Sequence, residues 1–115
     1  MKRVAIYARV ALNTGVGNQS CETQLLDLRE YCRARGWESL TEYVDEGVSG
    51  LKQRRPALDR LMPEVKARRV DVVVVAALDR LSRSVRHCVT CLELFRHVGV
   101  EFISLADEGL LGGSR

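Results

Sequence analysis

The sequence lacks any long apolar run, and its longest such stretch, Val72 to Leu78, is far too short to cross a bilayer. No basic and apolar leader precedes the first strand-like segment, so we expect no export signal and a cytoplasmic protein without membrane contact. Internal repeats and low-complexity segments are also missing. The 115 residues are enough for one compact domain and too few for two of ordinary size.

A second pair of metal-ligating side chains is missing as well. Cysteines stand at positions 21, 32, 88 and 91, and Cys88 and Cys91 form a Cys-x-x-Cys motif beside His87. A zinc or redox site would need a second ligand pair or a loop between strand and helix. Because this motif falls inside a helical pattern, we expect no metal site and interpret the thiols as reduced and mostly packed.

Positive charge is only slightly in excess, with 18 Lys and Arg against 15 Asp and Glu. A net charge of +3 is lower than that of most dedicated DNA-binding domains, so composition alone identifies no partner. Arginines outnumber lysines, however, and several of them follow strand-like segments. Arginine is suited to bidentate recognition of phosphate, which favours a phosphate-containing ligand.

Strand-like runs alternate with segments of helical spacing along the chain. We predict strands at Val4–Ala8, Trp37–Val44, Val70–Ala77 and Val100–Leu105, and helices at Cys21–Arg35, from Pro56 onward and at Ser82–Val98. Pro63 inside the second helix should cost about 3 kcal/mol or kink it. This order of elements predicts an α/β domain of three layers, with a mainly parallel sheet of four or five strands flanked by helices.

Polar clusters follow three of the predicted strands, at the edge of the sheet where α/β domains bind ligands. Arg9 follows the first strand and Asp45–Arg55, a glycine-containing basic loop, follows the second. After the third strand, Arg80 and Arg83 would share one side of a first helical turn, where a phosphate is favoured. The alternative is an ordinary helix cap with solvated arginines.

Together these segments resemble the catalytic domain of the serine recombinases, the resolvase and invertase family. No single motif is specific, but the set keeps the family's order and covers nearly the whole chain. The resemblance rests on Tyr7-Ala8-Arg9-Val10, Gln24-Leu25, Tyr43-x-Asp45-x-Gly47-x-Ser49-Gly50, Arg55-Pro56-x-Leu58, Leu78-Asp79-Arg80-Leu81-Ser82-Arg83 and Phe102-Ile103-Ser104-Leu105.

The resemblance implies a resolvase-like fold and site-specific DNA recombination without a metal or nucleotide cofactor. In this family a serine hydroxyl attacks a DNA phosphodiester and forms a 5′-phosphoserine bond, and a tetramer exchanges the cut strands by rotation. The resemblance also implies that Arg9, Arg80 and Arg83 bind the scissile phosphate. Asp79 would support these arginines.

Two further residues, Gln24 and Arg55, would assist in or beside the site. At the place of the nucleophilic serine, however, this sequence has Ala11. A methyl group cannot attack phosphorus, so we expect the chain to be catalytically inactive. Thr14 or Ser20 could substitute only with in-line geometry, and a misplacement of about 1 Å already costs roughly a hundredfold.

Gly15 also stands where the family often has a glutamine, and by resemblance Gln19 would be the displaced counterpart of that glutamine. By resemblance we expect residues 1–115 to be the catalytic domain, with the family's dimerisation helix and DNA-binding domain absent. We expect DNA as the partner, and a homodimer or homotetramer in the full-length context or a monomer for this chain alone.

Two alternatives remain open at this point. The chain could be a non-catalytic partner that pairs with an intact recombinase and regulates it, which an exposed apolar surface around Cys91, Leu94 and Val98 would support. A nucleotide-binding or phosphoacceptor domain is less favoured, because no glycine-rich phosphate loop directly follows the first strand.

Overall fold

A computed structural model describes residues 2–11, 21–48, 56–82 and 84–107 of the chain. The predicted loop over residues 13–20 lies outside these ranges. In chain order the elements are β1 (Arg3–Ala11), α1 (Cys21–Ala34), β2 (Ser39–Val48), α2 (Pro56–Lys66), β3 (Val72–Val75), α3 (Leu78–Leu81), α4 (Val85–Val98), β4 (Glu101–Ser104) and the 3-10 turn η1 (Leu105–Asp107).

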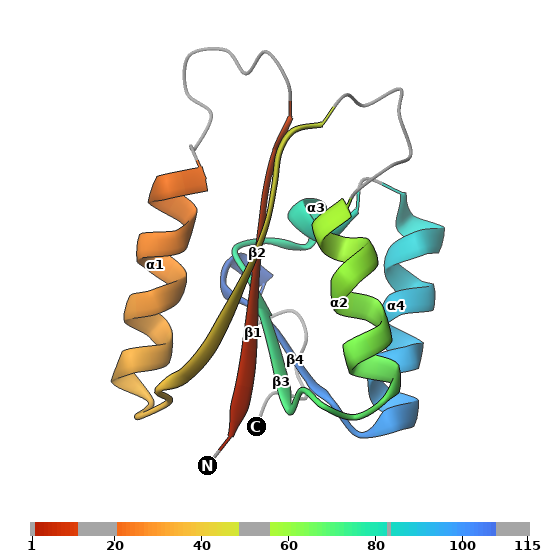
Figure 1. The fold of residues 1–115 in the computed structure, drawn as a ribbon. Helices are drawn as coiled ribbons and strands as arrows, with labels where there is room; N and C mark the ends of the chain where they lie inside the picture. The colour runs from red at the N-terminus through yellow and green to blue at the C-terminus, as the bar shows by residue number, and fades with distance from the viewer. Residues whose placement is uncertain (1, 12–20, 49–55, 83, 108–115) are drawn as a thin grey trace.

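The described strands form one fully parallel sheet in the order β2-β1-β3-β4. Helix α1 covers one face of this sheet, while α2 and α4 cover the other (Figure 1). The predicted three-layer α/β fold with a four-stranded parallel sheet is therefore confirmed, and the described residues contain no fifth strand. None of the helices in these ranges is long and apolar enough to cross a membrane.

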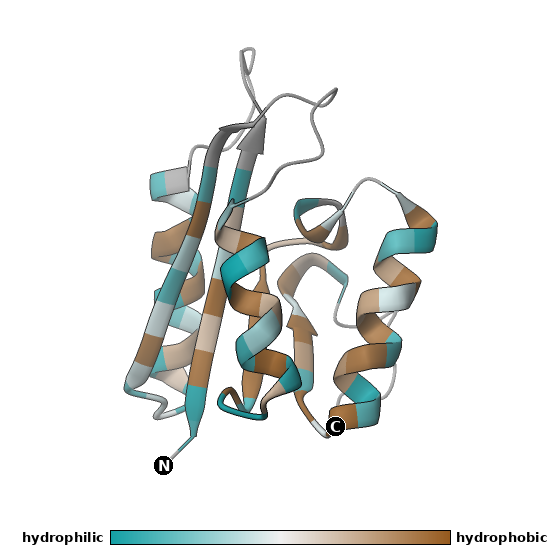
Figure 2. Cartoon of the chain, turned by 45° about the vertical axis from the view of Figure 1, so that its right-hand side comes forward, coloured by the Kyte–Doolittle hydropathy of each residue, from teal (hydrophilic) through white to brown (hydrophobic). Residues whose placement is uncertain are grey.

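Alternating side chains of the central strands build a core on each face of the sheet. Val73 and Val75 of β3 pack toward α2 and α4, whereas Val72 and Val74 pack toward α1. All of β3 is buried, as expected from its β-branched sequence. Figure 2 shows hydrophobic colour along these central strands.

Helix α2 continues through Pro63 to Lys66, so the proline does not end it. Pro63 is exposed, and water can reach the carbonyl of Asp59 that loses its helical partner there. On the opposite side of α2, Leu61 and Val65 are fully buried against the sheet. Their burial offsets the lost hydrogen bond.

The helix predicted over Ser82–Val98 is present as α4, which begins three residues later at Val85, and a separate one-turn helix, α3 at Leu78–Leu81, precedes it. Ser82 is extended, with φ −165° and ψ 148°, and separates the one-turn helix α3 from α4. The Ser84 side chain caps α4 by accepting the His87 N–H at 3.2 Å. Serine hydroxyls compete with helical hydrogen bonds in this way. Arg80 consequently lies on α3, not on the first turn of the long helix.

Strands β1 and β2 are longer than predicted and continue together past the end of β3 (Figure 1). Pairing of β1 with β3 ends at Tyr7, whereas pairing with β2 continues to Ala11. Arg9 therefore lies within a strand rather than after one, and Asp45 begins the last part of β2 rather than a loop. Each strand satisfies the other's backbone hydrogen bonds, which allows this extension.

The apolar face of α4 also differs from the prediction. The helical spacing of Val85, Cys88, Val89, Leu92 and Phe95 predicts that these residues form one apolar face. Val85 and Val89 are nevertheless 78% and 46% exposed. Cys91 is buried instead, and Leu94 and Val98 pack against the core. An exposed apolar surface around these last three residues, which would have supported pairing with an intact recombinase, is thus absent. Hydrophobic periodicity identifies an amphipathic helix, but it locates the buried face only to within one residue position around the helix axis.

Candidate active site

Arg9 is a buried arginine close to the carboxyl end of β1, with 6% of its surface exposed. Its Nε donates a hydrogen bond of 3.2 Å to the carbonyl oxygen of Arg80. This bond joins β1 to α3, two elements 71 residues apart in sequence. Two of the residues predicted to bind phosphate are therefore brought to the same edge of the sheet.

The backbone of Arg9 is held by Gln24, a fully buried residue of α1. The Arg9 N–H donates to Gln24 Oε1 at 3.3 Å, and Gln24 Nε2 donates to the Arg9 carbonyl at 3.1 Å. The side-chain amide thus pairs with the strand much as a neighbouring strand would, beyond the point where β3 ends. These contacts of Gln24 hold the Arg9 backbone in place, and a role of Gln24 in the site stays a prediction.

Asp45 is a buried carboxylate that the sequence pattern placed at the start of a glycine-containing loop. It accepts hydrogen bonds from the Tyr7 hydroxyl at 2.7 Å and from the N–H groups of Ala57 and Leu58 at 2.8 and 3.2 Å. Asp45 on β2 therefore caps the N-terminus of α2 and ties it to β1. Its motif was visible in the sequence, but this role was missed because no local pattern links position 45 to the start of α2.

The other predicted site residues are placed only in part. The backbone of Ala11 forms the last residue of β1, and that of Asp79 lies in α3. Arg55 and Arg83 lie outside the described residues, as do Thr14, Gly15, Gln19 and Ser20. The structure thus brings Arg9, Gln24 and Arg80 together and leaves the convergence of Arg83 with them a prediction.

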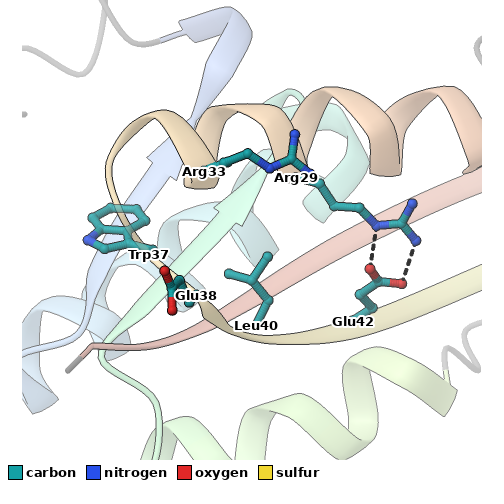
Figure 3. A pocket seen from close by; sticks show the side chains of 6 residues that line it. All are labelled: Arg29, Arg33, Trp37, Glu38, Leu40 and Glu42. Atoms are coloured by element: carbon teal, nitrogen blue, oxygen red, sulfur yellow. Dashed lines mark hydrogen bonds and ion pairs between the residues drawn. The ribbon is translucent and has the colours of Figure 1, made fainter.

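A hollow of about 410 Å³ lies away from this edge, between α1 and the first residues of β2 (Figure 3). Arg29 forms an ion pair with Glu42 there, with Nη2 and Oε1 2.9 Å apart, and this hydrogen bonding lowers the pKa of Glu42. The hollow therefore lies toward the amino ends of the strands, opposite the end that carries Arg9. The lining residues are Arg29, Arg33, Trp37, Glu38, Leu40 and Glu42.

Cys32, Cys88 and Cys91 are free thiols. Burial raises the pKa of the Cys32 thiol. The Cys88 thiol lies 3.3 Å from the Ser82 carbonyl oxygen, to which it donates, and Cys91 Sγ lies 3.6 Å from His87 Nε2. Within the described part of the chain, no three His, Cys, Asp or Glu side chains are grouped so that they could hold a metal ion.

The fold and this edge define a parallel α/β domain with a buried arginine near the carboxyl end of β1, past the last residue that pairs with β3, held through both its backbone and its side chain. Residues 4–113 match the family described as the resolvase N-terminal domain. The chain therefore belongs to this family of serine recombinase domains.

Individual relatives agree with this assignment. The chain is 34% identical over 101 residues to the transposon Tn917 resolvase of Enterococcus faecalis, covering 88% of this chain and 48% of that protein. It is 37% identical over 107 residues to the probable DNA-invertase y4cG of Sinorhizobium fredii, covering 92% and 30%. The chain thus spans about half or less of the length of these curated relatives.

Solved structures show the same fold. The N-terminal catalytic domain of TP901-1 integrase superimposes with a TM-score of 0.81 at 38% identity, covering 93% of this chain and 80% of that one. The C-terminal catalytic domain of ISC1926 TnpA, an IS607-like serine recombinase, gives a TM-score of 0.71 at 32% identity, covering 90% and 67%.

Proposed function

We propose that the chain is a serine recombinase catalytic domain that binds a DNA phosphate but does not cleave the strand. The single observation that carries this proposal is the hydrogen bond from Arg9 Nε to the Arg80 carbonyl, with the Arg9 backbone held by Gln24. It fixes two family-motif arginines at one edge of the sheet. The DNA substrate comes from the relatives, which are named resolvases, invertases and integrases.

The arginines supply the electrostatic part of the family reaction. When a serine oxygen attacks phosphorus, negative charge grows on the phosphoryl oxygens until the 3′-oxygen leaves. Guanidinium groups that are already in place stabilise this charge without reorganisation. In our proposal Arg9, Arg80 and Arg83 serve this role, Asp79 orients them, and Arg55 contacts the DNA beside them.

The nucleophile is the part that is missing. Ala11 is the last residue of β1, two positions beyond Arg9 on the same strand. Its side chain carries no lone pair for attack on phosphorus. The chain should accordingly bind DNA and leave both strands intact.

The test is a titration of fluorescent duplex DNA at increasing salt. We expect weak, sequence-independent binding that falls steeply with salt, because phosphate contacts release counterions. Arg80→Ala should weaken it by about three- to tenfold, as expected for one phosphate contact. Arg33→Ala, at the hollow on the opposite end of the sheet, is the matched control for loss of one positive charge. Tight binding to one sequence that persists in high salt would contradict the proposal, and so would an Arg80→Ala variant no weaker than Arg33→Ala.

A second candidate function is favoured by the exposed Val85 and Val89 on α4. In this candidate the chain pairs through α4 with another recombinase chain, as a homodimer or as a regulator of an intact enzyme. Two apolar side chains one turn apart on a helix present a shared surface to such a partner. Sedimentation of the chain with and without Val85→Asp and Val89→Asp would test it, and an unchanged monomer in both cases would exclude self-pairing.

A further inference from the structure

Helix α3, which carries Arg80, has no side-chain cap from its own N-cap residue at its N-terminus. Its N-cap residue Ala77 is extended and offers no side-chain hydrogen bond. The N–H of Leu78 instead donates to Oδ2 of Asp107 at 3.0 Å. A carboxylate 29 residues further along the sequence therefore satisfies the first amide of this helix.

Asp107 is itself held in place at the end of β4. The Ser104 hydroxyl, which is fully buried, donates to the same Oδ2 atom at 2.7 Å. Beside this contact, the Ala106 N–H donates to the Ala76 carbonyl at 2.9 Å. The backbone bond joins η1 to the segment that leads into α3, and the Asp107 carboxylate cannot turn away without breaking its hydrogen bonds with Ser104 and Leu78.

The position of α3 depends on contacts of this kind because the helix is only four residues long. A single turn fixes several dihedral angles for very few internal hydrogen bonds and is unstable alone. Its internal bonds include those from the Arg80 N–H to Ala77 and from the Ser82 N–H to Leu78. Asp107 holds its first residue, and the Arg9 guanidinium holds the Arg80 carbonyl near its end.

We propose that Asp107 is a positioning residue for Arg80, an inference that rests on the proposed role of Arg80 in binding a DNA phosphate. The carboxylate fixes the start of α3, and the Arg9 guanidinium fixes its end. Together they determine where the Arg80 side chain leaves the backbone. Loss of the Asp107 acceptor releases the first amide of α3 and lets the Arg80 backbone move.

The experiment measures the affinity of the chain for fluorescent duplex DNA at low salt, by anisotropy. The variants are Asp107→Ala, Asp107→Asn, Arg80→Ala and the double variant of Asp107→Ala with Arg80→Ala. We expect Asp107→Ala to weaken binding by about three- to tenfold, the effect of losing one anchored contact. Asp107→Asn should stay within about twofold of the parent, because its amide oxygen accepts the same two hydrogen bonds.

The double variant tests whether Asp107 acts through Arg80. If it does, the double variant binds no more weakly than Arg80→Ala, since the contact that Asp107 positions is already gone. Asp71→Ala is the matched control: Asp71 accepts hydrogen bonds from Arg3 at the amino end of the sheet, far from α3. It should lower stability and leave DNA affinity unchanged.

Different failures separate this inference from the proposed function. If Arg80→Ala weakens binding and Asp107→Ala does not, Asp107 has no positioning role and the proposed function stands. If neither weakens binding, both are wrong. Additive losses in the double variant, or an equal loss in Asp71→Ala, would overturn the positioning role. Should Asp107→Ala not fold, Ser104→Ala replaces it, with an expected loss of about two- to threefold because Asp107 keeps one of its two donors.

Discussion

The hydroxyl group of Tyr7 donates a hydrogen bond of 2.7 Å to Oδ2 of Asp45 inside the protein, across 38 residues of sequence. The same carboxylate also accepts hydrogen bonds from the backbone N–H groups of Ala57 and Leu58, in the first turn of α2. One buried group therefore joins β1, β2 and α2. Asp45 also pairs in register with Arg9, so this junction directly supports the strand that carries the candidate site.

Replacing the carboxylate should destabilise the fold strongly. Asp45→Ala leaves a buried hydroxyl and two buried amides without their acceptor, and we expect it to lower the free energy of unfolding by about 2–4 kcal/mol. Tyr7→Phe removes only one donor and should cost about 1 kcal/mol. Urea denaturation of both variants measures these values. An Asp45→Ala variant as stable as Tyr7→Phe would show that water replaces the carboxylate.

Gln24 should act on stability through the backbone of Arg9. Gln24→Ala removes both hydrogen bonds to that backbone from a fully buried position and should cost about 1–3 kcal/mol. The amide of Arg9 should also exchange with solvent hydrogen faster in this variant, which NMR can follow. Glu30→Ala, an exposed change on the same helix, is the control and should leave both measurements nearly unchanged.

The sequence predicts the layers of the fold better than the details of the site. Burial of Val72 to Val75 follows directly from a run of β-branched residues, and the αL conformation of Gly36 at φ 79° follows from its position after a helix. The contacts of Asp45 are different, because they join residues far apart in sequence. Periodicity reports on neighbours three or four residues away and carries no information about such pairs.

The break between α3 and α4 shows the same limit at short range. Ser82 and Ser84 are both compatible with a helix, and both are also good caps. Which role they take depends on contacts that helical spacing does not report, including the hydrogen bond from the Cys88 thiol to the Ser82 carbonyl. The family motif predicts Arg80 as a site residue, but it does not reveal that a separate one-turn helix carries this arginine.

Stability should depend on pH through Asp71. Hydrogen bonds from the Arg3 side chain and backbone lower the pKa of Asp71 from 3.8 to about 2. The folded state thus favours the ionised carboxylate, and its stabilisation is complete above pH 4 and is lost as the pH falls toward 2. Urea denaturation between pH 6 and 3 should show Asp71→Asn less stable than the parent at the upper end, with the difference shrinking below pH 4. A difference that grows on acidification would contradict this assignment.

Restoring one hydroxyl at position 11 should restore attack on DNA. The residue is in strand β1, paired with Val48, and serine adopts an extended backbone as readily as alanine. The relatives are longer than this chain, so the test uses a fusion to the remaining part of Tn917 resolvase. With nicked duplex DNA carrying the sites of that resolvase, the Ala11→Ser fusion should form a protein-linked 5′ end on a denaturing gel, and the unsubstituted fusion should form none.

Adding Arg80→Ala to Ala11→Ser should lower the amount of adduct by about a hundredfold or more, because the attack then lacks one charge-stabilising group. An adduct from the unsubstituted fusion would identify another nucleophile, with Thr14 and Ser20 the first to replace. No adduct from the Ala11→Ser fusion would mean that the site lacks more than its serine, and Gly15→Gln would then be the next change to make.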